Sequence, residues 1–151
     1  MQSPQLLSGL IAIVMLTAGH WAMFAKAGEP GWKALIPVYS DFTMFKLVWS
    51  AKAFFIYVAS GVGFIVLYLL SGQIHLDASG QLFLTEASNG LLAGLAYVLS
   101  LVFLAYCVIL AIRTAFAYGK SALFAFGLLI LPNIFALILG FGSAQYRGIR
   151  Q

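Results

Sequence analysis

Few side chains in this sequence can do acid–base or ionic chemistry, and most of them lie between long apolar runs. The 151 residues include eight lysines or arginines and four acidic residues. Four of the cations, Lys26, Lys33, Arg113 and Lys120, follow apolar runs closely, where they could gather anionic lipid headgroups. This pattern indicates a binding surface at a membrane interface or, alternatively, an interfacial enzyme that modifies lipids.

Patterns typical of catalysis or metal binding are weak. His20 is the one ionisable residue inside an apolar run, and a hydrogen bond to a neighbouring helix or headgroup explains it better than proton relay. Ser60, His20 and Asp77 fall at different levels of the expected membrane, so they do not predict a triad. His75, Asp77 and Glu86 lack the spacing of a metal site. We therefore predict no catalytic residue, cofactor, metal site or nucleic-acid partner.

Composition indicates what surrounds these residues. The chain is 63% hydrophobic and 8% charged, with a mean hydropathy of +1.02, whereas soluble domains average about 25% charged residues. A water-soluble core of this size could not bury so much apolar surface. The sequence therefore predicts an all-α integral membrane protein, in which the single cysteine, Cys107, is a small buried hydrophobe.

Four apolar runs have about the 20 residues that a membrane-spanning helix needs. We predict a single membrane domain over 1–151, built as a four-transmembrane-helix bundle. Pro132 and Asn133 interrupt the fourth run, which either crosses as a kinked helix or turns back as a re-entrant pair of half-helices. The four predicted spans are 6–24, 53–71, 90–112 and 121–140.

The charges of the connecting segments predict their orientation. Segment 25–52 holds four lysines and segment 113–120 two cations, whereas 72–89 has no Lys or Arg. By the positive-inside rule the first two are cytoplasmic and the third is external, which places the N-terminus outside. A fourth span would put Arg147 and Arg150 outside, against the rule. A re-entrant fourth segment would remove this conflict.

Segment 25–52 has the pattern of an interfacial helical elbow. Its lysines alternate with Trp and Tyr, which is typical of a chain anchored at headgroup depth. The sequence predicts a turn at GEPG, one short helical turn that ends at Ile36, and a new helix capped by Ser40 or Asp41 that continues without a break into the second span. The candidate interaction or lipid surface comprises Lys26, Trp32, Lys33, Pro37, Tyr39, Arg113 and Lys120.

The polar segment 72–89 contains apolar residues at alternate positions on both sides of DASG. This alternation predicts a short external β-hairpin or lid.

Small residues four positions apart allow helices to approach closely in lipid. Such pairs favour packing within the monomer or, alternatively, a dimer or partner face. The pairs are Ala59 with Gly63, Gly90 with Gly94, and Ala111 with Ala115.

Two stretches carry a family resemblance: FAKAGEPGWKALIPVYS, and AFAYGKSALFAFGLLILPNIFALILGFGSAQY. They resemble a bacterial family of small membrane proteins of unknown function, with the motif K-A-G-x-P-G-W-x-A-L-I-P-x-Y-N, then F-G-K, then L-G-F-G-x-x-Q-Y. Ser40 and Tyr118 depart from that pattern. A similar domain precedes the catalytic region of some bacterial signal peptidases. The resemblance implies a multi-pass scaffold in the bacterial cytoplasmic (inner) membrane and no peptidase activity, because that catalytic region is absent.

Three functions are consistent with these observations. The first is a noncatalytic, membrane-embedded interaction or accessory module, whose partners are membrane lipids and either another membrane protein or a second copy of the chain. The second is a small channel or carrier, which would need a polar path through the spans. The third is the interfacial lipid-modifying enzyme.

Overall fold

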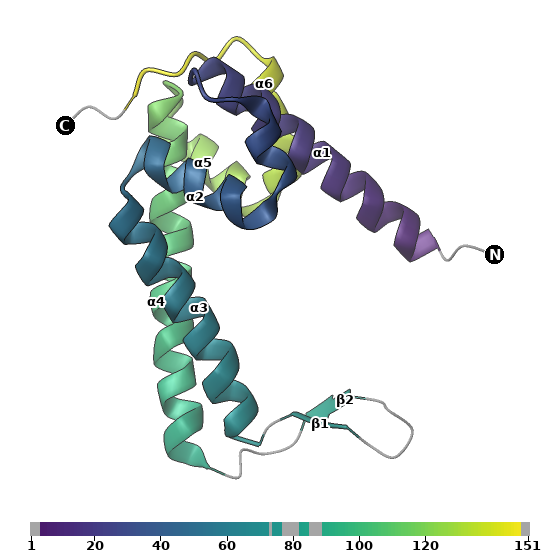
Figure 1. Cartoon of the computed structure of the whole chain (residues 1–151), viewed down its shortest axis with the longest axis vertical. Helices are drawn as coiled ribbons and strands as arrows, with labels where there is room; N and C mark the ends of the chain where they lie inside the picture. Colours follow the sequence, from purple (N-terminus) through teal and green to yellow (C-terminus); the bar gives the residue numbers. More distant parts are fainter. Residues whose placement is uncertain (1–3, 73, 77–81, 85–88, 149–151) are drawn as a thin grey trace. The chain divides into compact units, whose positions relative to one another are not determined.

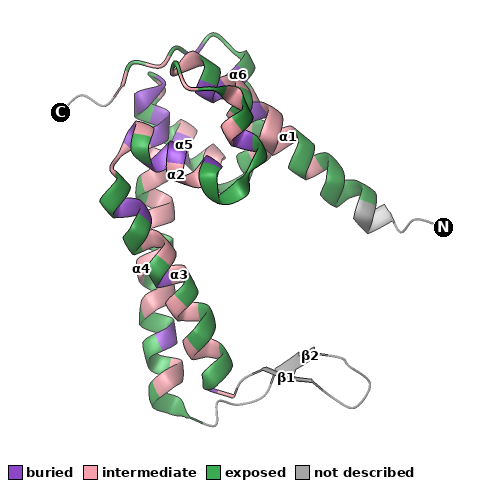
Figure 2. Cartoon of the chain, in the orientation of Figure 1, coloured by how far each residue is buried: buried purple, intermediate pink, exposed green. Residues whose placement is uncertain are grey.

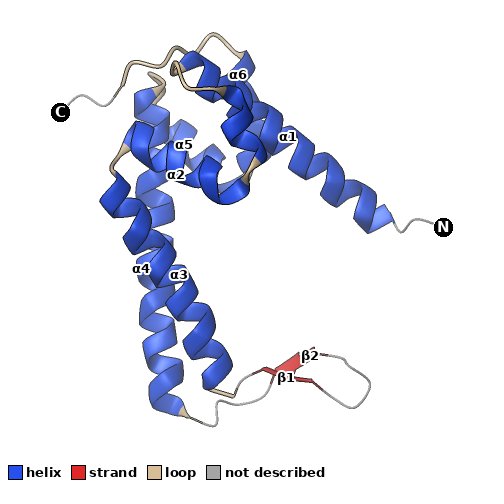
Figure 3. Ribbon diagram, in the orientation of Figure 1, coloured by secondary structure: helices blue, strands red, loops and turns tan. Residues whose placement is uncertain are grey.

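The computed structural model describes residues 4–72, 74–76, 82–84 and 89–148, which are mostly helical (Figures 1 and 3). In chain order the elements are α1 (Pro4–Lys26), the 3-10 helix η1 (Gly31–Leu35), α2 (Pro37–Val48), α3 (Ala51–Leu70), β1 (Ile74–Leu76), β2 (Leu82–Leu84), α4 (Gly90–Ala117), α5 (Ala122–Ile130) and α6 (Pro132–Phe141).

Three of these helices are long and apolar enough to cross a membrane. They comprise Leu7–Lys26 of α1, Ala51–Leu70 (α3) and Gly90–Ala117 (α4). Most of their surface is exposed apolar side chain, as lipid-facing helices require. The prediction of a helical membrane protein is confirmed at this level.

The chain divides into two compact units. Unit 1 contains residues 1–54 and 107–151, and unit 2 contains residues 55–106. All eight lysines and arginines of the sequence belong to unit 1. The two units therefore differ in chemistry as well as in sequence.

Unit 1 has a core where the C-terminal half of α1 meets α2, α6 and the residues that follow α4 (Figure 2). Phe24, Val48, Tyr118 and Leu139 are among its buried side chains. They come from both ends of the sequence, so the first and last helices are joined through this core.

The fourth apolar run forms two short helices, not one. α5 ends at Ile130 and α6 begins at Pro132, because proline has no amide hydrogen to continue the helix. The two helices pack face to face: the rings of Phe124 and Phe135 lie 4.8 Å apart, edge to face. Gly127 allows this approach, since a Cβ there would overlap the Phe135 ring. The described residues therefore contain three helices of membrane-spanning length and two shorter ones here, and the four-span bundle is not confirmed.

The elbow differs from its prediction at two points. Its second helix begins at Pro37, a favourable first helical position, and not at a cap formed by Ser40 or Asp41. The predicted unbroken passage into the second span is also wrong, because Trp49 leaves the helical conformation. The Ser50 hydroxyl then accepts a hydrogen bond from the Ala53 amide (3.2 Å) and caps the start of α3.

Within unit 2, α3 and α4 pack antiparallel through aromatic and small residues. The rings of Tyr57 and Phe103 stack at 4.7 Å. A Cβ at Gly61 would lie 3.0 Å from the same Phe103 ring, and one at Gly63 would lie 2.8 Å from Leu99. The glycines therefore give the larger side chains of α4 the room to pack.

The segment between α3 and α4 contains a pair of antiparallel strands. Ile74 pairs with Leu84, His75 with Phe83 and Leu76 with Leu82. Asp77 and Glu86, which were considered as metal ligands, lie outside the described residues. Whether this pair of strands is external is a matter of topology and stays a prediction.

Candidate interaction and lipid surface

The site is supported by a very close contact between α1 and α6. A Cβ at Gly19 would lie 2.8 Å from the carbonyl carbon of Ala136, and one at Gly140 would lie 2.7 Å from the Gly19 carbonyl oxygen and 2.8 Å from the Ala22 methyl. Small residues at these positions let the two backbones touch. Residue numbers rise together along the contact, so the two helices are parallel.

Lys26, at the end of α1, caps the C-terminus of α6. Its ammonium donates hydrogen bonds to the carbonyl oxygens of Leu139 (2.7 Å), Gly142 (2.6 Å) and Ala144 (2.9 Å). The last carbonyls of a helix have no intrahelical partner and carry the negative end of its dipole. Lys26, predicted as a lipid ligand, therefore has a structural partner.

Two tyrosines fasten the same end of unit 1. The Tyr118 hydroxyl donates to the Met23 carbonyl (2.8 Å), and the Tyr146 hydroxyl donates to the Leu47 carbonyl (2.7 Å). Their rings meet edge to face at 5.4 Å. Burial, together with the neighbouring Tyr146, raises the pKa of Tyr118 well above its ordinary value, so its hydroxyl stays protonated and able to donate.

His20 also bonds within the protein. Its Nδ1 lies 3.1 Å from the Ser40 hydroxyl, and its ring stacks on Phe24 at 5.9 Å. The hydrogen bond joins α1 to α2, in line with the expected role of a residue bonded to a neighbouring helix. Ser40 does not cap α2 because it lies inside the helix, where its amide donates to the Ile36 carbonyl (2.8 Å).

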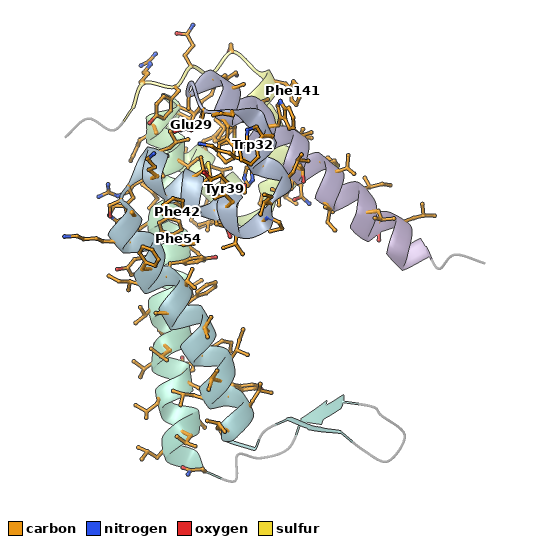
Figure 4. The ribbon with its side chains drawn as sticks, in the orientation of Figure 1. Glu29, Trp32, Tyr39, Phe42, Phe54 and Phe141 are labelled. Carbon is orange, nitrogen blue, oxygen red and sulfur yellow. The ribbon has the colours of Figure 1, made fainter. Side chains whose placement is uncertain are left out.

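The elbow presents an exposed pair of aromatic rings. Trp32 and Tyr39 stack at 5.8 Å (Figure 4). Lys33 lies 5.6 Å from the centre of the Tyr39 ring and forms a salt bridge with Glu29. The hydrogen bond from Lys33 lowers the pKa of the Glu29 carboxyl. These contacts hold two amphipathic rings and a cation at one place on the surface.

Further rings continue this pair into an aromatic ladder, which Figure 4 shows in part. Tyr39 stacks on Phe42 at 6.3 Å, and Phe42 meets Phe54 edge to face at 5.2 Å. The ladder ends at Trp49, whose ring lies 4.9 Å from the Arg113 guanidinium. Its members, in spatial order, are Trp32, Tyr39, Phe42, Phe54, Phe45 and Trp49.

Next to the end of the ladder, Arg113 belongs to a second group of cations. Arg113, Lys120 and Arg147 border a cavity of about 740 Å³. The Arg147 backbone amide donates to the Ala117 carbonyl (2.7 Å), which fixes the tail beside the end of α4. Gly119 takes a positive φ of 70° at the turn, a conformation that glycine adopts without strain.

The predicted surface residues thus separate into three groups. Trp32, Lys33 and Tyr39 lie together, Arg113 and Lys120 lie at the cavity, and the half-buried Lys26 is bonded to the end of α6. Pro37 is exposed at the first position of α2.

The predicted small-residue pairs also have different surroundings. Ala111 and Ala115 are buried against Ala125 of α5, and Gly63 faces Leu99. Ala59, Gly90 and Gly94 are exposed, and a Cβ at Gly90 or Gly94 would meet nothing within 4 Å among the described residues.

Sequence reasoning missed Arg147 and the contact between α1 and α6. A crossing fourth span would place Arg147 on the opposite side of the membrane from Lys120, so the sequence did not indicate that the two belong to one site. The spacing of Ala136 and Gly140, four residues apart, was a signal of the same kind as the predicted pairs.

No protein-family model, curated protein or solved structure matches the chain. The family resemblance therefore stays a prediction.

Proposed function

We propose that this chain is a noncatalytic membrane-embedded interaction module whose binding face is the elbow end of unit 1. The observation that carries the proposal is that the polar side chains there are hydrogen-bonded within the protein, whereas two aromatic rings are exposed. Lys26 and Tyr118 donate to backbone carbonyls and His20 bonds to Ser40 of α2, while Trp32 and Tyr39 remain exposed. Such a division suits a fixed surface for recognition.

The alternative functions receive less support from the same contacts. A channel or carrier would need polar groups along the spans, yet the Ser60 and Ser100 hydroxyls donate to carbonyls of their own helices and His20 bonds to Ser40. An interfacial lipid enzyme would need a nucleophile and a base beside the cations.

We further infer that α1, α3 and α4 cross the membrane and that α5 and α6 form a re-entrant hairpin. Lys120 before α5 and Arg147 after α6 border the same cavity. At 1.5 Å per residue, α5 and α6 are each roughly 15 Å long, about half of a 30 Å hydrocarbon core. This topology places every lysine and arginine on the cytoplasmic side and agrees with the positive-inside rule.

Cysteine labelling tests the topology. In a Cys107→Ser background, Lys33→Cys and Ser143→Cys should react with a membrane-impermeant maleimide from the cytoplasmic side, and Ser79→Cys from the outside. Reaction of Ser143→Cys from the outside would mean that the fourth segment crosses.

The binding face is tested by the double substitution Trp32→Ala/Tyr39→Ala. Two differently tagged copies of the chain and the co-purifying membrane proteins are quantified after crosslinking in membranes. Loss of two exposed rings should reduce association with the partner roughly tenfold, because the aromatic surface that would be buried in the complex is removed. The control, Tyr97→Ala/Leu101→Ala, removes two exposed side chains from unit 2. An equal loss in both variants would refute the proposed face.

A further inference from the structure

The cavity beside Arg113 combines a charged rim with an apolar wall. Its volume is about 740 Å³, within the range of roughly 300–1,000 Å³ typical of sites for small molecules. Ile109, Ile112 and Phe116 of α4 provide the apolar wall. A small hydrophilic anion would leave this wall unused, so the cavity favours an amphiphilic ligand.

The three cations of the rim have no acidic partner within the described chain, where the one salt bridge is between Lys33 and Glu29. Arg113 lies over the Trp49 ring at 4.9 Å, and Lys120 lies 5.9 Å from the Phe124 ring. Contact with aromatic faces positions a cation without neutralising its charge. Their charge is therefore available to an anion.

Gly119 brings the third cation to the rim. A Cβ at this position would lie 3.0 Å from the Arg147 side-chain nitrogen Nε. The glycine thus leaves room for the Arg147 side chain against the turn, one residue before Lys120.

A smaller hollow of about 200 Å³ adjoins the first, because both are bordered by Gly119, Lys120 and Arg147. Its further residues include Ser143 and Gln145, so it is polar. Two of the cations therefore stand between a polar hollow and an apolar one. A phospholipid has this same order of parts: a polar headgroup, a phosphate and an acyl chain.

The length of α4 places the cavity at headgroup depth. Its 28 residues span roughly 42 Å, more than the hydrocarbon core of about 30 Å. The last turns of the helix, which carry Arg113 and Phe116, can therefore reach the interface.

The geometry points to a binding site for one anionic phospholipid, with its phosphate at Arg113, Lys120 and Arg147 and an acyl chain along Ile109, Ile112 and Phe116. Guanidinium groups favour phosphate because their donors form a matching fork. This inference deepens the proposed function, since it names a lipid as one partner of the same end of unit 1, but the two can fail separately.

Lipid exchange between nanodiscs tests the site. The full chain is placed in phosphatidylcholine nanodiscs with a minor fraction of phosphatidylglycerol, and the lipids that remain bound after transfer to detergent are counted by native mass spectrometry. We expect retention of one phosphatidylglycerol in preference to phosphatidylcholine. Equal retention of the two lipids would overturn the inference.

A matched pair of variants locates the site. Lys120→Gln/Arg147→Gln should reduce phosphatidylglycerol retention about tenfold or more, from the loss of two cations near a phosphate. Lys46→Gln/Lys52→Gln removes the same charge from two exposed positions and should change retention less than about twofold. Equal losses would mean a general effect of net charge and would overturn the site. If the first variant unfolds, Arg147→Gln alone, at an exposed position, should still reduce retention severalfold.

Competition distinguishes a lipid from a soluble anion. Inorganic phosphate or glycerol phosphate at millimolar concentration should not displace phosphatidylglycerol, because neither has an acyl chain to bury against the apolar wall. Displacement at that concentration would identify a soluble phosphate site and overturn the lipid assignment. Loss of lipid binding with partner association retained would refute this inference alone. Loss of association in the Trp32/Tyr39 variant with lipid still bound would show that the two surfaces act separately.

Discussion

The two units differ in how far apart in the sequence their hydrogen-bonded side chains and carbonyls lie: unit 1 has local bonds such as that from Thr43 to the Tyr39 carbonyl, but it also has long-range ones. In unit 1, Lys26, Tyr118 and Tyr146 form hydrogen bonds to residues 95 to 118 positions away in the sequence. In unit 2, the Ser60 and Ser100 hydroxyls donate to carbonyls three residues earlier in their own helices. Long-range hydrogen bonds specify one arrangement of distant segments, whereas local ones satisfy a polar group wherever the helix goes.

This difference indicates that specific tertiary structure and membrane insertion depend on different residues. Apolar helices such as α3 and α4 are stabilised in lipid by their length and hydropathy. Unit 1 adds contacts that only particular residues can make, together with every lysine and arginine of the chain. Substitutions in unit 1 should therefore be costly at positions where matched substitutions in unit 2 are tolerated.

The largest difference is expected at Lys26. Lys26→Met removes three hydrogen bonds to the end of α6 and should lower the free energy of unfolding by roughly 2–4 kcal/mol. Thermal unfolding in detergent measures this loss, and amide exchange over 136–144 should accelerate. Lys46→Met, at an exposed site on α2, is the control. Equal effects of the two changes would contradict the capping role.

The next test compares two helical glycines. Gly19→Ala should destabilise unit 1 by about 1–3 kcal/mol through overpacking, because its Cβ would overlap Ala136. Gly94→Ala in unit 2 meets nothing within 4 Å among the described residues and should stay within about 0.5 kcal/mol. The measurement is the unfolding midpoint of each variant in the same detergent, and reversal of the order would contradict the close contact.

A smaller effect is expected from removing one hydroxyl. Tyr118→Phe removes the hydroxyl that donates to the Met23 carbonyl, which keeps the Ala27 amide as a second donor (3.1 Å), and should cost about 1 kcal/mol. Tyr97→Phe removes the hydroxyl of a 65% exposed tyrosine in unit 2 and should be nearly neutral. If both variants unfold at the wild-type temperature, the Tyr118 bond contributes nothing to stability.

The smallest effect concerns Asp41. Burial raises the pKa of its carboxyl, so folding disfavours the charged form, and this cost is fully present only above the folded-state pKa. Asp41→Asn should therefore raise the unfolding midpoint slightly at neutral pH. The gain should vanish below the unfolded-state pKa of about 3.9. A gain that is unchanged between pH 3 and pH 7 would rule out this electrostatic origin.

Hydropathy predicted the helices of membrane length to within a few residues. The predicted spans 6–24, 53–71 and 90–112 correspond to the observed helices Pro4–Lys26, Ala51–Leu70 and Gly90–Ala117. The same scale could not distinguish one crossing helix from a hairpin over 121–140, because lipid-facing residues look alike in either form. Pro132 was the local signal that left both possibilities open.

The contacts of the site were harder to predict because they join distant segments. Lys26 looked like a headgroup ligand, and only its nearness to the end of α6 gives it carbonyl partners. Likewise Trp49, where the helix breaks, has no proline or glycine beside it. Local sequence supplied the aromatic and cationic residue types, and tertiary packing decided which of them face outward.

The contact between α1 and α6 also sets an order of events during synthesis of the chain. α1 is synthesised before α6, yet the carbonyls that receive the Lys26 ammonium belong to residues 139–144, which are 113 to 118 positions later in the sequence. Until residues 136–144 have been made, Gly19 and Lys26 lack the partners that they have in the folded structure. A stop codon at Gly140 should therefore destabilise α1, and make it a substrate for membrane proteases, although α1 itself is unchanged.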